Sequence, residues 1–262
     1  MQMKYLNPYR LTSRGFTLIE MAIVLMIVGL LLGGLLVPLS AQMDQRNNSD
    51  TQKALSEIKE ALIGYTMANG FLPCPADPAI ATGSAGAGLS RATCTTTASS
   101  TGVVPWNTLG VSETDAWGHR FTYKVTPEFA DAINLNTFGY DNNPAYGCVS
   151  THICVPVNNP QSASFALCSC GTLNVLAFAS GSTIGSNVPA VVISHGKHAA
   201  GAWTPQGTQL LPVSSDPSEA DNSNGGTTYV SMTTPTTTFD DLVVWISPNI
   251  LINRMVSAGK LP

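Results

Sequence analysis

The sequence predicts an α+β fold, in which one long N-terminal helix packs on the antiparallel β-sheet of a globular head. The helix is indicated by an uncharged apolar run at residues 21–39 and by a helical spacing of apolar residues that continues to residue 68. The sheet is indicated by short segments that are rich in β-branched and aromatic residues and bounded by Gly, Pro or Asn. These segments are residues 121–125, 173–178, 190–194, 227–232 and 242–247.

The composition favours an exported protein over a cytosolic enzyme. Charged residues make up 11% of the chain, against about 25% in an average soluble domain. Runs of Thr, Ser, Asn and Gly supply polarity instead, for example at residues 92–102. The net charge is −4, and three of the twelve basic residues precede the first acidic one. The body of the chain therefore lacks the basic surface that nucleic-acid binding requires.

The apolar run at residues 21–39 is predicted to span a membrane. Its nineteen residues carry no charge, and a helix needs roughly 20 to cross the hydrocarbon core. A cleaved secretory signal is the alternative, but its apolar part would have only about 7–15 residues, followed by a small-residue cleavage site. Because Lys4, Arg10 and Arg14 precede the run, the N-terminus is expected in the cytoplasm and the head outside.

The segment in front of this run reads Arg14-Gly15-Phe16-Thr17-Leu18-Ile19-Glu20. Together with the basic leader and the apolar helix, it resembles the prepilins, the precursors of type IV pilins and type II secretion pseudopilins. The resemblance implies that a prepilin peptidase cuts between Gly15 and Phe16 and that the new N-terminus at Phe16 is methylated. Fifteen of the 262 residues would be removed, leaving a mature chain of 247 in which Glu20 is the fifth residue.

Glu20 is predicted to need a cationic partner. A carboxylate in an apolar helix costs up to roughly 2.5–3.5 kcal/mol at the centre of a bilayer. After cleavage the nearest cation is the α-amino group of Phe16, four residues earlier on the same helix face. Glu20 could pair within its own chain or extend to the membrane surface. The resemblance implies instead a pair with the Phe16 amine of the next subunit, which makes Glu20 an assembly residue.

The chain is expected to divide into four segments. Beyond the span, apolar residues recur at helical spacing with charged residues between them, so the helix is predicted to continue as an amphipathic segment. These apolar residues are Leu55, Ile58, Leu62 and Tyr65, and Asn69-Gly70 is expected to end the helix. The segments are a leader at 1–15, a transmembrane helix at 16–41, its amphipathic continuation at 42–70 and an exported globular head with long loops at 71–262.

Two local patterns are expected inside the head. Asp115 precedes Trp117-Gly118, and an aspartate at such a place caps a turn. Ser247-Pro248 is a cap and first-turn pair for a short closing helix. Ile250, Leu251 and Met255 are predicted to share one face of that helix.

The cysteines predict disulfides in an oxidising compartment, because they are even in number and all follow the apolar run. They are Cys74, Cys94, Cys148, Cys154, Cys168 and Cys170. In an extended segment Cys168 and Cys170 would be about 6.6 Å apart, close to the upper limit for a bridge. They are therefore expected to pair with Cys148 and Cys154, which leaves Cys74 with Cys94. Six cysteines allow fifteen full pairings, and the others stay open.

Acidic residues late in the chain predict either a calcium site or an acidic turn exposed to solvent. Calcium prefers six to eight oxygen ligands, and some pseudopilins, which this region resembles only in its acidic residues, hold calcium in a late loop. The candidate ligands are Asp216, Glu219, Asp221, Asn222, Asp240 and Asp241.

Other potential sites have weaker support. His195 and His198 flank a glycine, which favours a solvated loop over a metal or catalytic pair. The cysteines around His152 lack the CxxC spacing of a zinc site. The segment Ser180-Gly181-Ser182 lacks the full spacing of a nucleophile elbow.

The resemblance implies a structural subunit and not an enzyme. It implies a single-pass protein of the bacterial inner membrane, with the head in the periplasm, that assembles into a type IV pilus or a type II secretion pseudopilus. Its partners would be other pilin or pseudopilin subunits and a prepilin peptidase that also methylates. The large head, with insertions at 80–102 and 142–171, favours a minor subunit. No cofactor is required, and calcium is a candidate ligand. The alternative is a membrane-anchored periplasmic enzyme or ligand-binding domain.

Overall fold

The computed structural model describes residues 15–130, 163–167, 169–210, 214–234 and 236–261, and of these it leaves out the side chains of residues 32–40. Within it the chain forms two compact units, Met1–Arg46 and Asn47–Pro262. Helix α1 (Leu18–Asn69) begins in the first unit and ends in the second. We call the second unit the head unit.

The head unit contains a four-stranded antiparallel sheet in the order β1-β2-β5-β7. Thr122 of β2 pairs with Ile193 of β5, and Ala190 of β5 pairs with Ile246 of β7. All five residues of β5 are buried, as expected for an inner strand covered on both faces. The bounds are Thr101–Val103 for β1, Thr122–Val125 for β2, Ala190–Ser194 for β5 and Leu242–Ile246 for β7.

A second, three-stranded sheet has the order β4-β3-β6. Strand β3 (Leu173–Leu176) pairs antiparallel with β4 (Thr183–Val188) and parallel with β6 (Thr228–Val230). The antiparallel prediction therefore holds for the first sheet but not for this one pair. Parallel strands need a long crossover connection, and the chain between β3 and β6 includes β4, β5 and the helix α4 (Pro217–Ser223).

Four short helices follow α1 among the described residues of the head unit, and the closing helix α5 begins as predicted. Ser247 is its N-cap and Pro248 lies in its first turn, while Leu251 and Met255 are buried. Ile250 is 45% exposed, so its predicted place on the packing face is wrong: at 100° per residue it turns away from the stripe that residues 251 and 255 share. The four helices are α2 (Trp106–Leu109), α3 (Pro127–Ala130), α4 (Pro217–Ser223) and α5 (Pro248–Ser257).

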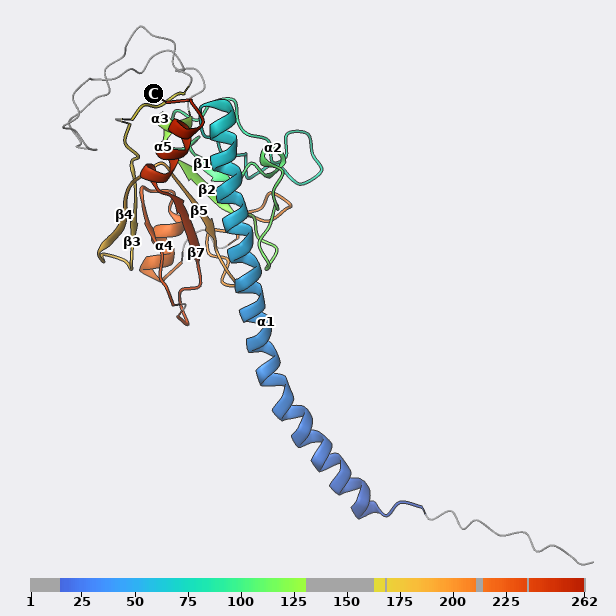
Figure 1. The fold of residues 1–262 in the computed structure, drawn as a ribbon. Coiled ribbons are helices and arrows are strands. Elements are labelled where there is room, and N and C mark those ends of the chain that lie inside the picture. Colours follow the sequence, from blue (N-terminus) through green and yellow to red (C-terminus); the bar gives the residue numbers. More distant parts are fainter. Residues whose placement is uncertain (1–14, 131–162, 168, 211–213, 235, 262) are drawn as a thin grey trace, which may run out of the picture. The chain divides into compact units, whose positions relative to one another are not determined.

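The head unit is layered: helices α1, α3 and α5 pack on one face of the first sheet, and the second sheet packs on the other (Figure 1). Side chains alternate between the two faces of a strand. Leu55, Ile58 and Leu62 of α1 therefore share a core with Val192 of β5. Its neighbour Ile193 packs against the second sheet. The predicted apolar stripe of the helix is confirmed for these three residues, whereas its fourth member, Tyr65, is only half-buried. Helix α1 ends at Asn69, before Gly70 with φ 85°.

Two buried phenols make the head unit sensitive to alkali. Burial raises the pKa of Tyr229 and, with a smaller contribution from Tyr65, the pKa of Tyr123 above the usual value of 10. Their hydroxyls donate to the carbonyls of Pro73 (3.1 Å) and Gly226 (3.0 Å), from Tyr123 and Tyr229 respectively. The unfolded chain loses these protons near pH 10. The contribution of the two phenols to stability is therefore fully present below that pH. It is lost as the pH rises towards their pKa values in the folded protein.

We expect the folded, uncut chain at about pH 11 to show tyrosinate absorbance from fewer than its seven tyrosines. The missing signal should appear when the protein unfolds. Tyr123→Phe and Tyr229→Phe should each raise the fraction of the remaining tyrosines that ionises without unfolding. Ionisation of all seven in one step, with the near-ultraviolet circular dichroism unchanged, would contradict this expectation.

Candidate functional site

The predicted cleavage motif lies on an open segment at the start of α1. Gly15, Phe16 and Thr17 precede the helix, which begins at Leu18. Phe16 is 82% exposed. No heavy atom lies within 4 Å of the place that a Cβ would take on Gly15. The described part of the chain therefore sets no steric requirement for glycine here.

Thr17 and Glu20 form a capping box, in which each residue satisfies a backbone donor of the other. The Glu20 carboxylate accepts from the Thr17 N–H (2.8 Å) and from its hydroxyl (2.9 Å). The Glu20 N–H in turn donates to Oγ1 of Thr17 (3.3 Å). The T-x-x-E pattern is readable in the sequence, although the ion-pair prediction for Glu20 did not include this capping role. The box turns the carboxylate back towards the N-terminal end of the helix, where Phe16 lies.

The first helical turns expose apolar side chains around the whole helix. An apolar surface of this size is unfavourable in contact with water, so lipid or protein is expected to cover it. Among the side chains that the structure describes, no helix carries an apolar stretch long enough to cross a membrane. The predicted segment 21–39 runs into residues 32–40, whose side chains lie outside that description. The exposed residues are Phe16, Leu18, Ile19, Met21, Ile23, Val24, Leu25, Met26, Ile27, Val28, Leu30 and Leu31.

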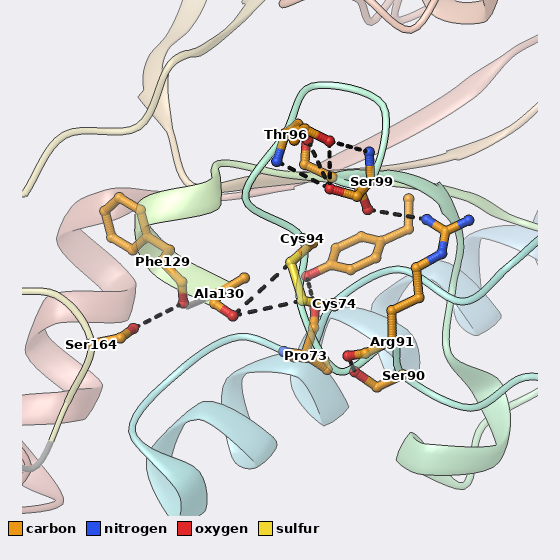
Figure 2. Close-up of a disulfide and its surroundings, with 12 residues drawn as sticks. Pro73, Cys74, Ser90, Arg91, Cys94, Thr96, Ser99, Phe129, Ala130 and Ser164 are labelled. Atoms are coloured by element: carbon orange, nitrogen blue, oxygen red, sulfur yellow. Dashed lines mark hydrogen bonds between the residues drawn. A yellow bond between two sulfur atoms is a disulfide. The ribbon is translucent and has the colours of Figure 1, made fainter. Parts of the chain in front are cut away.

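The predicted disulfide between Cys74 and Cys94 is confirmed, with a Cα–Cα distance of 5.6 Å. Both cysteines are buried, and Figure 2 shows their sulfur atoms facing the carbonyl of Ala130, at 3.7 and 4.0 Å. Cys170 also forms a disulfide, with a partner outside the described residues. The predicted cluster is otherwise untested, because Cys148, Cys154 and Cys168 lie outside the described residues as well.

The six predicted calcium ligands do not converge on one point. Asp216 is the N-cap of α4, and its Oδ1 accepts from the N–H groups of Ser218 and Glu219 at 2.8 and 3.4 Å. Hydrogen bonds, the strongest from Thr238, lower the pKa of Asp216. The Asn222 amide is held by both backbone groups of Val230. Calcium binding stays a prediction.

Asn222 also connects this region to a buried carboxylate, because its amide donates to Oδ2 of Asp241 at 2.8 Å. Oδ1 of Asp241 lies 3.6 Å from Nδ1 of His195. Both residues are almost fully buried. The other ring nitrogen of His195 lies 2.9 Å from the Thr122 hydroxyl. The expectation that His195 lies in a solvated loop is therefore wrong, because the end of the inner strand β5 carries it into the core.

The structure brings two of the predicted ligands, Glu219 and Asp240, to His198, which the sequence also placed in a solvated loop. Nδ1 of His198 lies 3.0 Å from Oε1 of Glu219 and 3.2 Å from Oδ1 of Asp240. In the sequence, the only indication of this cluster was the pair His195 and His198, three residues apart after a strand. Hydrogen bonding to Glu219, together with the charges of Asp240 and Glu219, raises the pKa of His198.

Comparison with known proteins identifies the N-terminal motif. Residues 10–36 match the model of the prokaryotic N-terminal methylation motif, the signature of type IV pilin and pseudopilin precursors. The match covers Gly15, Phe16, the capping box and the first turns of α1. The chain matches no curated protein and no solved structure.

Proposed function

We propose that this chain, which carries the prepilin signature at its N-terminus, is a structural subunit that is cut after Gly15 and then joins a filament of pilin-like subunits. The motif match is the observation that carries the proposal. Gly15 supports it, because its open surroundings leave the choice of glycine unexplained by the chain's own packing. A peptidase that must accommodate the backbone closely supplies a reason for glycine there.

The proposal places residues 16–41 in the bacterial inner membrane, with the N-terminus in the cytoplasm and the head in the periplasm. The exposed apolar side chains of residues 16–31 need a cover of lipid or of other helices. The Cys74–Cys94 disulfide fits an oxidising compartment. Other pilin or pseudopilin helices would replace the lipid when the subunit leaves the membrane and enters a type IV pilus or a type II secretion pseudopilus. The large head favours a minor subunit in either filament.

The test of processing is the mass of the mature N-terminus in hosts with and without prepilin peptidase. We expect a chain that starts with N-methylated Phe16 in the first host and an uncut chain in the second. Gly15→Leu should remain uncut in both hosts, and Gly15→Ala should be cut more slowly. An uncut wild-type chain in both hosts would reject the proposal and favour a membrane-anchored periplasmic protein of another kind.

The role of Glu20 in assembly can be separated from its role in the capping box. Glutamine at the same position keeps a capping box but carries no charge. We expect Glu20→Gln to be cut normally after Gly15 and to enter sheared filaments at a small fraction of the wild-type level, because the pair with the Phe16 amine of the next subunit is lost. Thr17→Ala is the matched control: it removes the hydroxyl of the box and leaves the carboxylate, so it should assemble. Equal incorporation of Glu20→Gln and wild type would contradict the ion-pair role.

A further inference from the structure

We propose that His198, Glu219 and Asp240 form a binding site for a divalent transition-metal ion such as zinc. The three residues come from separate parts of the head unit. His198 lies in the loop after β5, Glu219 lies in the first turn of α4, and Asp240 lies just before β7. The site needs neither cleavage nor filament assembly, so it is independent of the function proposed above.

The ligand atoms already lie close to the spacing that zinc requires. One atom of each residue lies within 4.8 Å of the other two. The nitrogen lies 3.0 and 3.2 Å from the two carboxylate oxygens. Around a tetrahedral zinc ion with bonds of about 2.0–2.2 Å, ligand atoms are about 3.3–3.5 Å apart. A metal ion would therefore enter with small movements of the side chains.

A proton at this place cannot satisfy both carboxylates. Nδ1 of an imidazole carries at most one hydrogen, and the geometry directs it to Glu219. Oδ1 of Asp240 is buried and has no hydrogen-bond partner among the described residues. A buried carboxylate oxygen without a partner is costly. A metal ion satisfies the nitrogen and both oxygens together, because each donates one lone pair to it.

The other oxygen of each carboxylate is held by donors that are not themselves ligand atoms. Oε2 of Glu219 accepts from the Ser214 hydroxyl at 2.6 Å. Oδ2 of Asp240 accepts from the N–H groups of Lys197 and His198 at 2.8 and 3.0 Å. Such outer contacts orient ligands in metal sites and contribute to affinity. Oε1 of Glu219 and Oδ1 of Asp240 are thereby fixed towards the imidazole.

Charge and exposure both suit a cation with an open coordination position. Glu219 and the nearby Asp241 are almost fully buried, so solvent screens their negative charge only weakly. The site therefore favours positive charge at Nδ1, whether from a proton or from a metal. The His198 side chain is 40% exposed, so solvent can supply a fourth ligand. A nitrogen with two oxygens suits zinc better than calcium, which takes six to eight oxygens.

The direct test is zinc binding by the full chain, purified in detergent and stripped of metal with EDTA. We expect one equivalent of zinc to bind and to raise the melting temperature. His198→Gln, Glu219→Gln and Asp240→Asn should each weaken binding at least tenfold and abolish the thermal shift. Asp221→Asn is the matched control, because Asp221 lies on the same helix as Glu219 but outside the cluster. It should bind zinc like the wild type.

Two further measurements keep the test valid if a ligand variant folds poorly. Ser214→Ala retains all three ligands and removes the outer donor to Glu219, so it should weaken zinc binding by about tenfold. Cobalt, used as a spectroscopic substitute, should give visible absorption bands of a four-coordinate nitrogen and oxygen site, which disappear in His198→Gln. The proposal is overturned if the wild type binds no zinc at micromolar concentration, if the three ligand variants bind it like the wild type, or if calcium alone binds.

Discussion

Replacement of Arg120 by methionine is expected to destabilise the head unit by about 3–5 kcal/mol, the cost of removing one partner from a buried charged network. Arg120 is fully buried. Its Nε donates to Oε1 of Glu113 at 2.9 Å, and its guanidinium carbon lies 4.6 Å from the centre of the Trp106 ring. The variant would leave the Glu113 carboxylate without this partner in a largely buried place.

The guanidinium also holds three loop segments together. Nη1 donates to the carbonyls of Pro78 and Ile80 at 2.9 and 3.0 Å. Nη2 donates to the Thr82 hydroxyl and to the carbonyl of Pro205, both at 3.0 Å. With Nε, all five N–H donors of the side chain are used. Lysine cannot reproduce this planar fork, so Arg120→Lys should recover only part of the loss.

Thermal unfolding of the full chain in detergent measures the Arg120 effect. In a unit of this size each kcal/mol shifts the melting temperature by roughly 2–4 °C, so Arg120→Met should melt about 10 °C below the wild type. Arg254→Met is the matched control, since Arg254 is exposed on α5, and it should change the melting temperature little. A loss no larger than that of Arg254→Met would show that the network does not stabilise the head unit.

The second large effect is expected from the disulfide. The double variant Cys74→Ser, Cys94→Ser should lose about 3 kcal/mol, because the bridge closes a loop with a sequence separation of 20 and so restricts the unfolded chain. Serine suits the site, since its hydroxyl can donate to the nearby carbonyl of Ala130. The double variant leaves the disulfide of Cys170 in place, whereas a reducing agent would break both.

Urea unfolding under oxidising conditions measures this loss. Wild type and double variant should unfold with different midpoints, and addition of a reducing agent should lower the wild-type midpoint to that of the variant or below it. Coincident midpoints of the two proteins under oxidising conditions would mean that the bridge contributes no stability.

Local patterns predicted much of this structure. Leu55, Ile58 and Leu62 follow the period of a helix, and a helix that buries one face must follow it, so the sequence was enough to place them in the core. The strands β5 and β7 were predictable from contiguous apolar residues, and β2 from the aromatic and β-branched residues on either side of Lys124. The N-terminal motif was recognisable for a different reason, because its residues are adjacent in the chain and need no tertiary contact to be read together.

Strand β4 was missed because its sequence, with Gly185 and Asn187, lacks the usual features of a strand. Three of its six residues are exposed and only Val188 is buried, so its apolar and polar residues do not alternate as in a half-buried strand. The glycine at position 185 is explained by a tertiary contact. Nε1 of Trp245 lies 3.0 Å from the place that a Cβ would take on Gly185, which leaves little room for a side chain. A contact between β4 and β7 cannot be inferred from either segment alone.

The polar groups were the least predictable part. Arg120 contacts the backbone carbonyls of residues 78, 80 and 205. A backbone acceptor is present at every position, so the residue types there do not show the contact. His198 meets Glu219 and Asp240 from two other elements in the same way. The sequence showed acidic residues in number, but it could not show which of them cap a helix, as Asp216 does, and which face the imidazole.

The position of the Cys74–Cys94 bridge determines how the head unit would respond to a pulling force. Tension that is carried along the backbone beyond the end of α1 passes through residues 70–74. The bridge passes this tension directly to Cys94, next to the segment that leads into β1. Residues 75–93 then form a side branch outside the line of force. A subunit that is pulled by its helix would transmit the load to its sheet without first unravelling this loop.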